Sequence, residues 1–192
     1  YITKTILSSE DDEILQTAKN YGAEVIKRPY ELALDEAKTA PVMLHVLEEL
    51  EKEGYSADYV VLLQPTCPLR DENYIDSAFE YYFEKQKEGF DSCFGAYSFG
   101  YTHAKWKILH NNKLEALYDF RLRPRRQEEE QHYKMICENG AFYALKWDTL
   151  KEVKDFIGYN PAAYITQRII DIDTVDDFKK VEEILIKRNE NA

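Results

Sequence analysis

The sequence lacks the long apolar runs and the basic charge that place a protein in a membrane or on nucleic acid. Its longest purely apolar stretch, residues 59–63, falls far short of the ~20 residues that a membrane-spanning helix needs. The 192 residues carry 36 acidic against 25 basic side chains, a formal net charge of −11. Because nucleic acids and anionic membranes both reward basic surfaces, we expect neither as a partner.

Cysteine is scarce, and the common catalytic motifs are missing. The three cysteines, Cys67, Cys93 and Cys137, are widely spaced, and an odd number cannot close a disulfide framework. They are typical of reduced thiols in a cytoplasmic protein, and the four histidines show no metal-ligand spacing. There is no glycine-rich dinucleotide motif or P-loop, which argues against a dinucleotide oxidoreductase, and no nucleophile elbow.

What the sequence contains instead is an alternation of apolar strand-like segments with amphipathic helices. Such alternation implies right-handed βαβ units, so we predict an α/β fold with a doubly wound, mostly parallel, Rossmann-like sheet. Residues 58–63 form a continuous apolar run of the kind that is buried on both faces of a parallel sheet. The predicted strands are residues 2–7, 23–26, 58–63, 92–97, 140–145 and 169–173.

Capping residues delimit the predicted helices. Ser9 and Asp12 have the spacing of a capping box, and Gly22 stands where the first helix should end. A second helix is predicted over residues 40–53 and a third around residues 75–83. Thr174 and Asp177 repeat the capping-box spacing before a C-terminal helix.

Between residues 98 and 138 the βα pattern stops. Residues 106–109 and 114–118 read as a hairpin that turns at Asn111-Asn112, and a charged stretch follows at residues 121–131. We therefore expect one domain over residues 1–192, interrupted by an inserted arm at about 98–138.

Ligands of open parallel sheets bind beyond the carboxyl ends of the strands, so the residues that follow each strand are candidates. Residues 64–70 leave the apolar strand, and Pro65 and Pro68 stiffen them. This holds Gln64 and Thr66 at the sheet edge for binding. The alternative is a rigid turn in which Arg70 is a surface charge.

Arg28 follows the second predicted strand, and Thr39 opens the next helix. The planar guanidinium of Arg28 suits a base carbonyl or a phosphate, and Thr39 could present a polar group beside it. In the alternative, Thr39 is the helix N-cap and Arg28 pairs with Glu31 or Asp35.

Asp171 and Asp173 lie two residues apart on the last predicted strand, so their carboxylates should converge on one face. A divalent cation would relieve their repulsion, and Mg²⁺ characteristically uses one or two carboxylates together with substrate phosphates. The alternative places Asp173 at the positive end of the following helix. Thr174 is the better cap there, which leaves the pair available.

Two further groups lie in the arm and just after it. Four arginines gather in an otherwise acidic chain and could meet a carboxylate or phosphates, or pair with Glu128, Glu129 and Glu130. Residues 138–143 combine an amide, a tight backbone and an aromatic ring, or form an ordinary turn into a core strand. The residues concerned are Arg121, Arg123, Arg125, Arg126, Asn139 and Tyr143.

Taken together and in this order, these segments resemble the acylneuraminate cytidylyltransferases, the CMP-sialic acid synthetase family. The most specific match is Gln64-Pro65-Thr66-Cys67-Pro68-Leu69-Arg70, and the ending Ile170-Asp171-Ile172-Asp173-Thr174 supports it. The other matching segments are residues 7–14, 28–35, 125–127 and 139–143.

The resemblance implies that the anomeric hydroxyl of a nine-carbon 2-keto sugar acid attacks the α-phosphate of CTP, giving a CMP-sugar and pyrophosphate. It also implies a homodimer built by the inserted arm. By position, the resemblance implies that Arg28 and Thr39 recognise cytosine and that Asn139 lies near the ribose or phosphates. Gln64, Thr66 and Tyr143 would bind the sugar acid, Arg126 would lie near the triphosphate or the substrate carboxylate, and Asp171 and Asp173 would hold Mg²⁺.

Some points stay open at this stage. Residues 8–10 read Ser-Ser-Glu where the family has Ser-Thr-Asp, and the family's Gly/Lys-rich triphosphate loop is absent. We expect the native chain to continue before Tyr1 with a central strand and that loop. The alternative is a non-catalytic binding or dimerisation remnant of the fold. The sugar acid could also be legionaminic acid, pseudaminic acid or Kdo, and the general base Asp171 or a metal-bound hydroxide.

Overall fold

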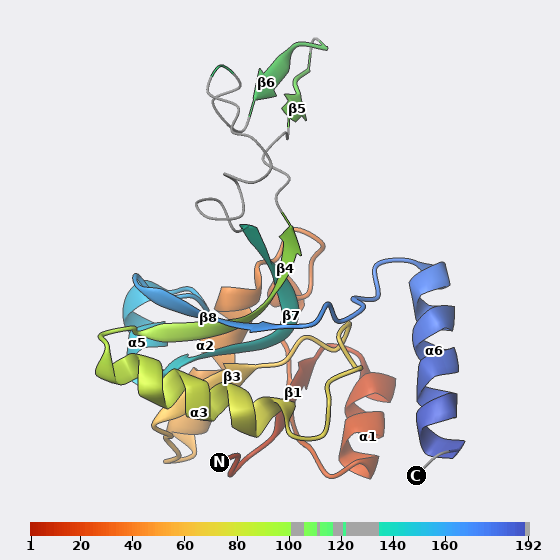
Figure 1. Cartoon of the computed structure of the whole chain (residues 1–192). Helices are drawn as coiled ribbons and strands as arrows, with labels where there is room; N and C mark the ends of the chain where they lie inside the picture. The colour runs from red at the N-terminus through yellow and green to blue at the C-terminus, as the bar shows by residue number, and fades with distance from the viewer. Residues whose placement is uncertain (101–105, 111, 117–120, 122–134, 191–192) are drawn as a thin grey trace. The chain divides into compact units, whose positions relative to one another are not determined.

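The computed structural model describes residues 1–100, 106–110, 112–116, 121 and 135–190. None of the helices in these segments is both long and apolar enough to cross a membrane. The strands are β1 (Ile6–Ser9), β2 (Glu24–Lys27), β3 (Tyr59–Leu62), β4 (Ser92–Gly100), β5 (Trp106–Ile108), β6 (Leu114–Ala116), β7 (Met135–Lys146) and β8 (Pro161–Thr166). The helices are α1 (Asp12–Asn20), the 3₁₀ turn η1 (Tyr30–Leu32), α2 (Thr39–Lys52), α3 (Tyr74–Lys87), α5 (Trp147–Val153) and α6 (Val175–Glu190) (Figure 1).

The chain divides into two compact units, which we describe separately. The first unit comprises Tyr1–Gln64, Arg70–Phe94 and Phe142–Tyr164. The second comprises Pro65–Leu69, Gly95–Ala141 and Ile165–Ala192.

The α/β class is confirmed, and the sheet is mixed. β1 and β2 pair in parallel, as the βαβ pattern predicts. A four-stranded sheet has the order β3-β7-β4-β8, and β3 runs antiparallel to β7 with Leu62 opposite Tyr143. The expectation of a parallel strand at residues 58–63 is therefore wrong for its pairing with β7, and the four residues of β3 are half-buried. An apolar run does not reveal the direction of its neighbour, because side chains alternate with the same period in both kinds of sheet.

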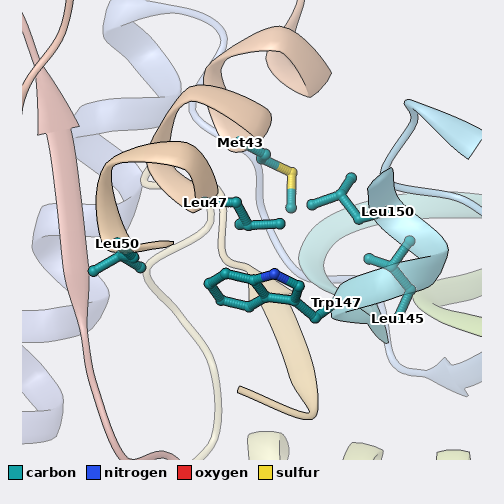
Figure 2. Close-up of a cluster of buried hydrophobic side chains, with 6 residues drawn as sticks. All are labelled: Met43, Leu47, Leu50, Leu145, Trp147 and Leu150. Carbon is teal, nitrogen blue, oxygen red and sulfur yellow. The ribbon is translucent and has the colours of Figure 1, made fainter. Parts of the chain in front are cut away.

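The core of the first unit forms where α2 meets β7 and α5. The periodic apolar residues of α2 contribute Met43, Leu47 and Leu50, which meet Leu145, Trp147 and Leu150 (Figure 2). Ile6 of β1 and Leu62 of β3 are partly buried and pack against the same cluster. Truncating a buried leucine of this kind to alanine typically costs about 2–5 kcal/mol.

The helix ends agree with the sequence except at the first. Asp11, not Ser9, is the N-cap of α1, and its Oδ1 accepts the N–H groups of Glu13 and Ile14 at 2.8 and 3.0 Å. Several short polar residues stand before this helix, and backbone geometry selects among them. Gly22 follows the helix with φ +85°, and the Asp177 N–H donates to Thr174 Oγ1 at 3.2 Å, as predicted.

In the second unit, the predicted hairpin is confirmed over its described part. β5 and β6 pair antiparallel, with Ile108 opposite Leu114, and Asn112 supplies the turn's left-handed residue at φ 59°. Much of the predicted arm lies outside the described residues, and its extent at about 98–138 stays a prediction.

The last strand is not where the sequence places it. The strand is β8, and residues 169–173 form no strand. β8 begins with a proline and its apolar residues do not alternate with polar ones, so it gives a weak strand pattern, whereas alternating isoleucine and aspartate imitates a strand well. The geometry of Asp171 and Asp173 therefore has to be established from the structure.

In the first unit, the half-buried carboxylate of Asp91 joins the start of β4 to the start of β8. Asp91 accepts the N–H of Tyr159 at 2.8 Å and that of Asn160 at 3.0 Å. The next residue, Ser92, accepts the N–H of Gly158 at 2.8 Å. A Cβ on Gly158 would lie 2.6 Å from Asp91 Cγ, closer than real Cβ contacts. Position 158 therefore requires glycine for lack of space.

We predict that Gly158→Ala lowers the free energy of unfolding by about 1–3 kcal/mol, the usual cost of overpacking. The carboxylate cannot move aside without losing its backbone hydrogen bonds. Urea unfolding measures the change, with the exposed Ser56→Ala as baseline variant. Equal stability of the two variants would contradict the close approach.

Candidate functional site

The loop after β3 is braced by its own arginine. Arg70 is half-buried, and its guanidinium donates to the carbonyl oxygen of Gln64 at 2.9 Å. The bond closes residues 64–70 on themselves, in addition to the stiffness that the two prolines supply. Arg70 is therefore more than a surface charge, and its bond agrees with the rigid turn of the alternative.

In the second unit, the middle of this loop is bound to two other segments. Cys67 is fully buried, and its thiol donates to the carbonyl oxygen of Asn139 on β7 at 2.6 Å. The carbonyl oxygen of the exposed Thr66 accepts the N–H of Ile172 at 2.9 Å. Thr66 and the Asp171–Asp173 segment, which the sequence proposes separately, are thus neighbours.

Asp171 and Asp173 belong to a segment that is not a strand. Both are exposed, whereas Ile172 between them is half-buried and bonded to the loop. In the described part of the chain, no group of three or more His, Cys, Asp or Glu side chains could hold a metal ion. A pair of exposed carboxylates is the donor set that Mg²⁺ uses when phosphate oxygens and water complete its coordination, so these residues fit that ion.

Asn139 is buried, with 4% of its surface exposed, and its amide is used inside the second unit. Its Oδ1 accepts the N–H of Ala141 at 3.1 Å, and its Nδ2 lies 3.5 Å from Thr166 Oγ1. Gly140 between them has φ +68°, which kinks β7, and the amide spans the kink. These contacts give Asn139 a structural role, and its role in nucleotide binding stays a prediction.

In the first unit, Arg28 is fixed at the ends of β1 and β2. Its guanidinium donates to the Ser8 carbonyl oxygen, and its Nε lies 3.4 Å from Ser8 Oγ. It forms no ion pair with Glu31 or Asp35 among the described residues, so that alternative is wrong. Thr39 is the first residue of α2, and Lys38 is the N-cap, so the capping alternative for Thr39 is wrong too.

The structure describes Tyr143 but not Arg126. Tyr143 is 5% exposed, and its ring packs edge-on against Phe156 with centroids 4.9 Å apart. Burial in the core explains its position, and contact with a sugar acid stays a prediction. Arg126 lies outside the described residues, as do Arg123 and Arg125.

The structure adds a pair that the sequence analysis missed. The guanidinium carbon of Arg168 lies 5.6 Å from the centroid of the Tyr97 ring on β4. A hydrogen bond with Cys137, together with burial, raises the pKa of Tyr97 above its ordinary value. The only available signal was a cationic residue three positions before Asp171, and a single charge predicts no partner.

Comparison with known proteins gives a consistent result. A protein-family model described as "Cytidylyltransferase" matches residues 1–188. The chain is 29% identical to a pseudaminic acid cytidylyltransferase of Campylobacter jejuni over 205 residues, which cover 98% of the chain and 80% of that enzyme. It is 26% identical to the N-acylneuraminate cytidylyltransferase of Oncorhynchus mykiss over 187 residues, covering 94% of the chain and 40% of that enzyme.

Solved structures agree in fold. A CMP:2-keto-3-deoxy-manno-octonic acid synthetase complexed with CTP matches 97% of the chain and 82% of its own length, with a TM-score of 0.65 at 14% identity. A 4-diphosphocytidyl-2C-methyl-D-erythritol synthase from Anaerococcus prevotii matches 96% of the chain and 82% of its own length, with a TM-score of 0.60 at 11% identity. At such low identity these similarities show the fold alone.

We predict that Asn139→Ala lowers the free energy of unfolding by about 1–3 kcal/mol, because it removes the buried Oδ1 that accepts the Ala141 N–H at 3.1 Å. Urea unfolding provides the measurement. Asn73→Ala is the control, since Asn73 is exposed and makes no side-chain cap bond at α3. An Asn139→Ala protein as stable as the control would exclude the structural role.

Proposed function

Because the chain belongs to the cytidylyltransferase family, we propose that it transfers CMP from CTP to the anomeric hydroxyl of a nine-carbon 2-keto sugar acid. The observation that carries this substrate class is the similarity, along almost the whole chain, to enzymes named for pseudaminic acid and N-acylneuraminate. The enzyme class itself, a CTP-dependent nucleotidyltransferase, follows from the family. A non-catalytic remnant has no comparable support.

Pseudaminic acid is the first sugar acid to test. The chain spans 80% and 79% of the two Campylobacter jejuni pseudaminic acid enzymes, against 43% of the N-acylneuraminate enzyme of Escherichia coli. The larger share of the enzyme covered and the higher identity, 29% against 26%, together favour pseudaminic acid. N-acetylneuraminate, legionaminic acid and Kdo are the alternatives within the same reaction.

The reaction joins two anions and needs local positive charge. The anomeric oxygen forms a bond to the α-phosphorus while the bond from that phosphorus to the bridging oxygen breaks. Pyrophosphate leaves, and the hydroxyl proton passes to a base. No covalent intermediate on the protein is required, so catalysis depends on positioning and on neutralising the phosphoryl oxygens. In a chain of net charge −11, a few cationic groups must supply that neutralisation.

Asp171 and Asp173 would hold Mg²⁺, which when bound supplies charge neutralisation at the phosphates. Two features of this chain support the assignment. The backbone bond from Ile172 to Thr66 fixes the segment between the carboxylates, and the capped helix α6 begins directly after it. Because the segment is already fixed, little conformational entropy would be lost when the two carboxylates bind a metal ion.

The remaining assignments are proposals residue by residue. Arg28 has a half-buried, oriented guanidinium that could recognise cytosine, with Thr39 at the start of α2 as a second contact. Gln64, Thr66 and Tyr143 would contact the sugar acid, Asn139 the ribose or phosphates, and Arg126 the triphosphate or the substrate carboxylate. Of these, Thr66 has the clearest structural support, because it is exposed and bonded beside the carboxylates.

Release of pyrophosphate tests the proposal. The full-length protein with CTP and Mg²⁺ should release pyrophosphate with pseudaminic acid or another nine-carbon keto acid, and not with CTP alone. Asp173→Asn should lower the rate about a hundredfold or more, since metal-borne charge stabilisation amounts to several kcal/mol. Asp176→Asn, an exposed carboxylate in the first turn of α6, is the matched control and should leave the rate unchanged.

Two results would contradict these assignments. Absence of pyrophosphate release with every nine-carbon and eight-carbon keto acid would exclude the proposed reaction. An Asp173→Asn enzyme with the wild-type rate would remove that residue from the metal site while leaving the reaction itself in place.

We also propose a homodimer that uses the β5–β6 hairpin. Ile108 and Leu114 are cross-strand partners, and 76% and 62% of their surfaces are exposed. A self-complementary interface between two copies would bury this apolar pair.

Light scattering coupled to size exclusion tests the dimer. The wild type should have twice the 22.6 kDa mass of one chain, and Ile108→Ser with Leu114→Ser should shift it toward the monomer. Val175→Ser, which changes another exposed apolar residue, on α6, should not. A wild-type monomer, or a dimer that withstands the double substitution, would contradict this use of the hairpin.

A further inference from the structure

Arg168 is held by an aromatic ring in the second unit. It follows β8, is exposed, and lies with its guanidinium carbon 5.6 Å from the Tyr97 centroid. That distance is within the range of about 6 Å at which a cation is attracted to a ring face. Arginine favours such contacts because its planar guanidinium is weakly hydrated.

The ring beneath Arg168 is itself fixed. Tyr97 belongs to β4 and is half-buried, and its side chain is hydrogen-bonded with Cys137 on β7. A ring anchored in two strands of a sheet offers a stationary platform. The guanidinium above it consequently loses little further freedom when it binds something.

The N–H groups of Arg168 have no acceptor among the residues that the structure describes. Arg28 and Arg70, by contrast, each donate to a backbone carbonyl oxygen. The five N–H donors of an arginine form a fork that matches carboxylate and phosphate oxygens. Arg168 therefore combines a fixed position with N–H donors that no described residue accepts, which is the arrangement of an anion-binding group.

Its place in the chain relates this group to the carboxylate pair. Arg168 precedes Asp171 by three residues, and three residues of extended chain span at most about 11 Å. The segment between them leads to Ile172, which is bonded to Thr66. An anion on Arg168 would thus lie within the length of a nucleoside triphosphate from Asp171.

We propose that Arg168, positioned by Tyr97, binds an anionic oxygen group of one of the two substrates, a phosphate of CTP or the carboxylate of the sugar acid. This inference rests on the proposed function and adds a substrate-binding residue to it. It also explains how an acidic chain attracts an anion beside two carboxylates. The proposed binding uses both the N–H donors of the guanidinium and its contact with the Tyr97 ring. Lysine at position 168 should therefore retain only part of the anion binding.

Steady-state kinetics in both substrates test the proposal and distinguish its two forms. A charge-assisted hydrogen bond contributes about 1.5–3 kcal/mol, so Arg168→Gln should raise one KM about tenfold to a hundredfold. A rise in the KM for CTP identifies a phosphate, and a rise in the KM for the sugar acid identifies the carboxylate. Arg168→Lys should fall between wild type and Arg168→Gln.

Variants of the ring separate positioning from folding. Tyr97→Phe keeps the aromatic face but loses the hydrogen bond with Cys137, so it should raise the affected KM less than Tyr97→Leu, which should resemble Arg168→Lys. Lys179→Gln, an exposed cation on α6, is the control for net charge and should have no effect. Thermal unfolding should show the Arg168 variants as stable as wild type, since the side chain is exposed.

A direct measurement of ligand binding tests the role of Arg168 without depending on turnover. Calorimetry measures the affinity of wild type and Arg168→Gln for CTP, inorganic pyrophosphate and N-acetylneuraminate. Weaker binding by Arg168→Gln supports the inference even if the wild type releases no pyrophosphate, in which case the proposed reaction alone fails. Wild-type affinities and KM values in Arg168→Gln overturn the inference, as does a wild type that binds none of the three probes.

Discussion

The hydrogen bond from the Ile172 N–H to the Thr66 carbonyl oxygen is the contact on which the candidate site of the second unit depends. It joins a loop stiffened by two prolines to the segment that carries Asp171 and Asp173. Ile172 is half-buried and the two aspartates are exposed, so a single backbone bond orients both carboxylates toward solvent. Within the part of the chain that the structure describes, this segment belongs to no strand.

The same loop is held from its other side by Cys67, whose buried thiol donates to Asn139 on the kinked strand β7. Around this loop, Asn139 is buried and helps to build the arrangement, whereas Thr66, Asp171 and Asp173 are exposed. Arg168 belongs to the latter group. This division separates residues that shape the site from residues that can meet a ligand.

Sequence reasoning succeeds here where the signal is local or periodic. The apolar period of α2, the glycine after α1, the Thr174 cap and the β5–β6 hairpin follow from short-range chemistry. It fails where a distant partner decides the outcome. Nothing local shows that β3 pairs antiparallel with β7, that Arg70 turns back to Gln64, or that Arg168 meets Tyr97. The segment around Asp171 imitates a strand in its alternation of isoleucine and aspartate, yet it forms none, and both aspartates are exposed.

We propose that Asp171 and Asp173 supply half of a metal site that CTP completes. Enhancement of water proton relaxation by Mn²⁺, titrated with and without CTP, measures it most directly because it detects metal on the protein before any turnover. We expect weak binding of Mn²⁺ to the protein alone and binding at least about tenfold tighter with CTP, as phosphate oxygens join the two carboxylates. Asp171→Asn should lose this gain. A Mn²⁺ affinity that neither CTP nor Asp171→Asn changes would contradict it.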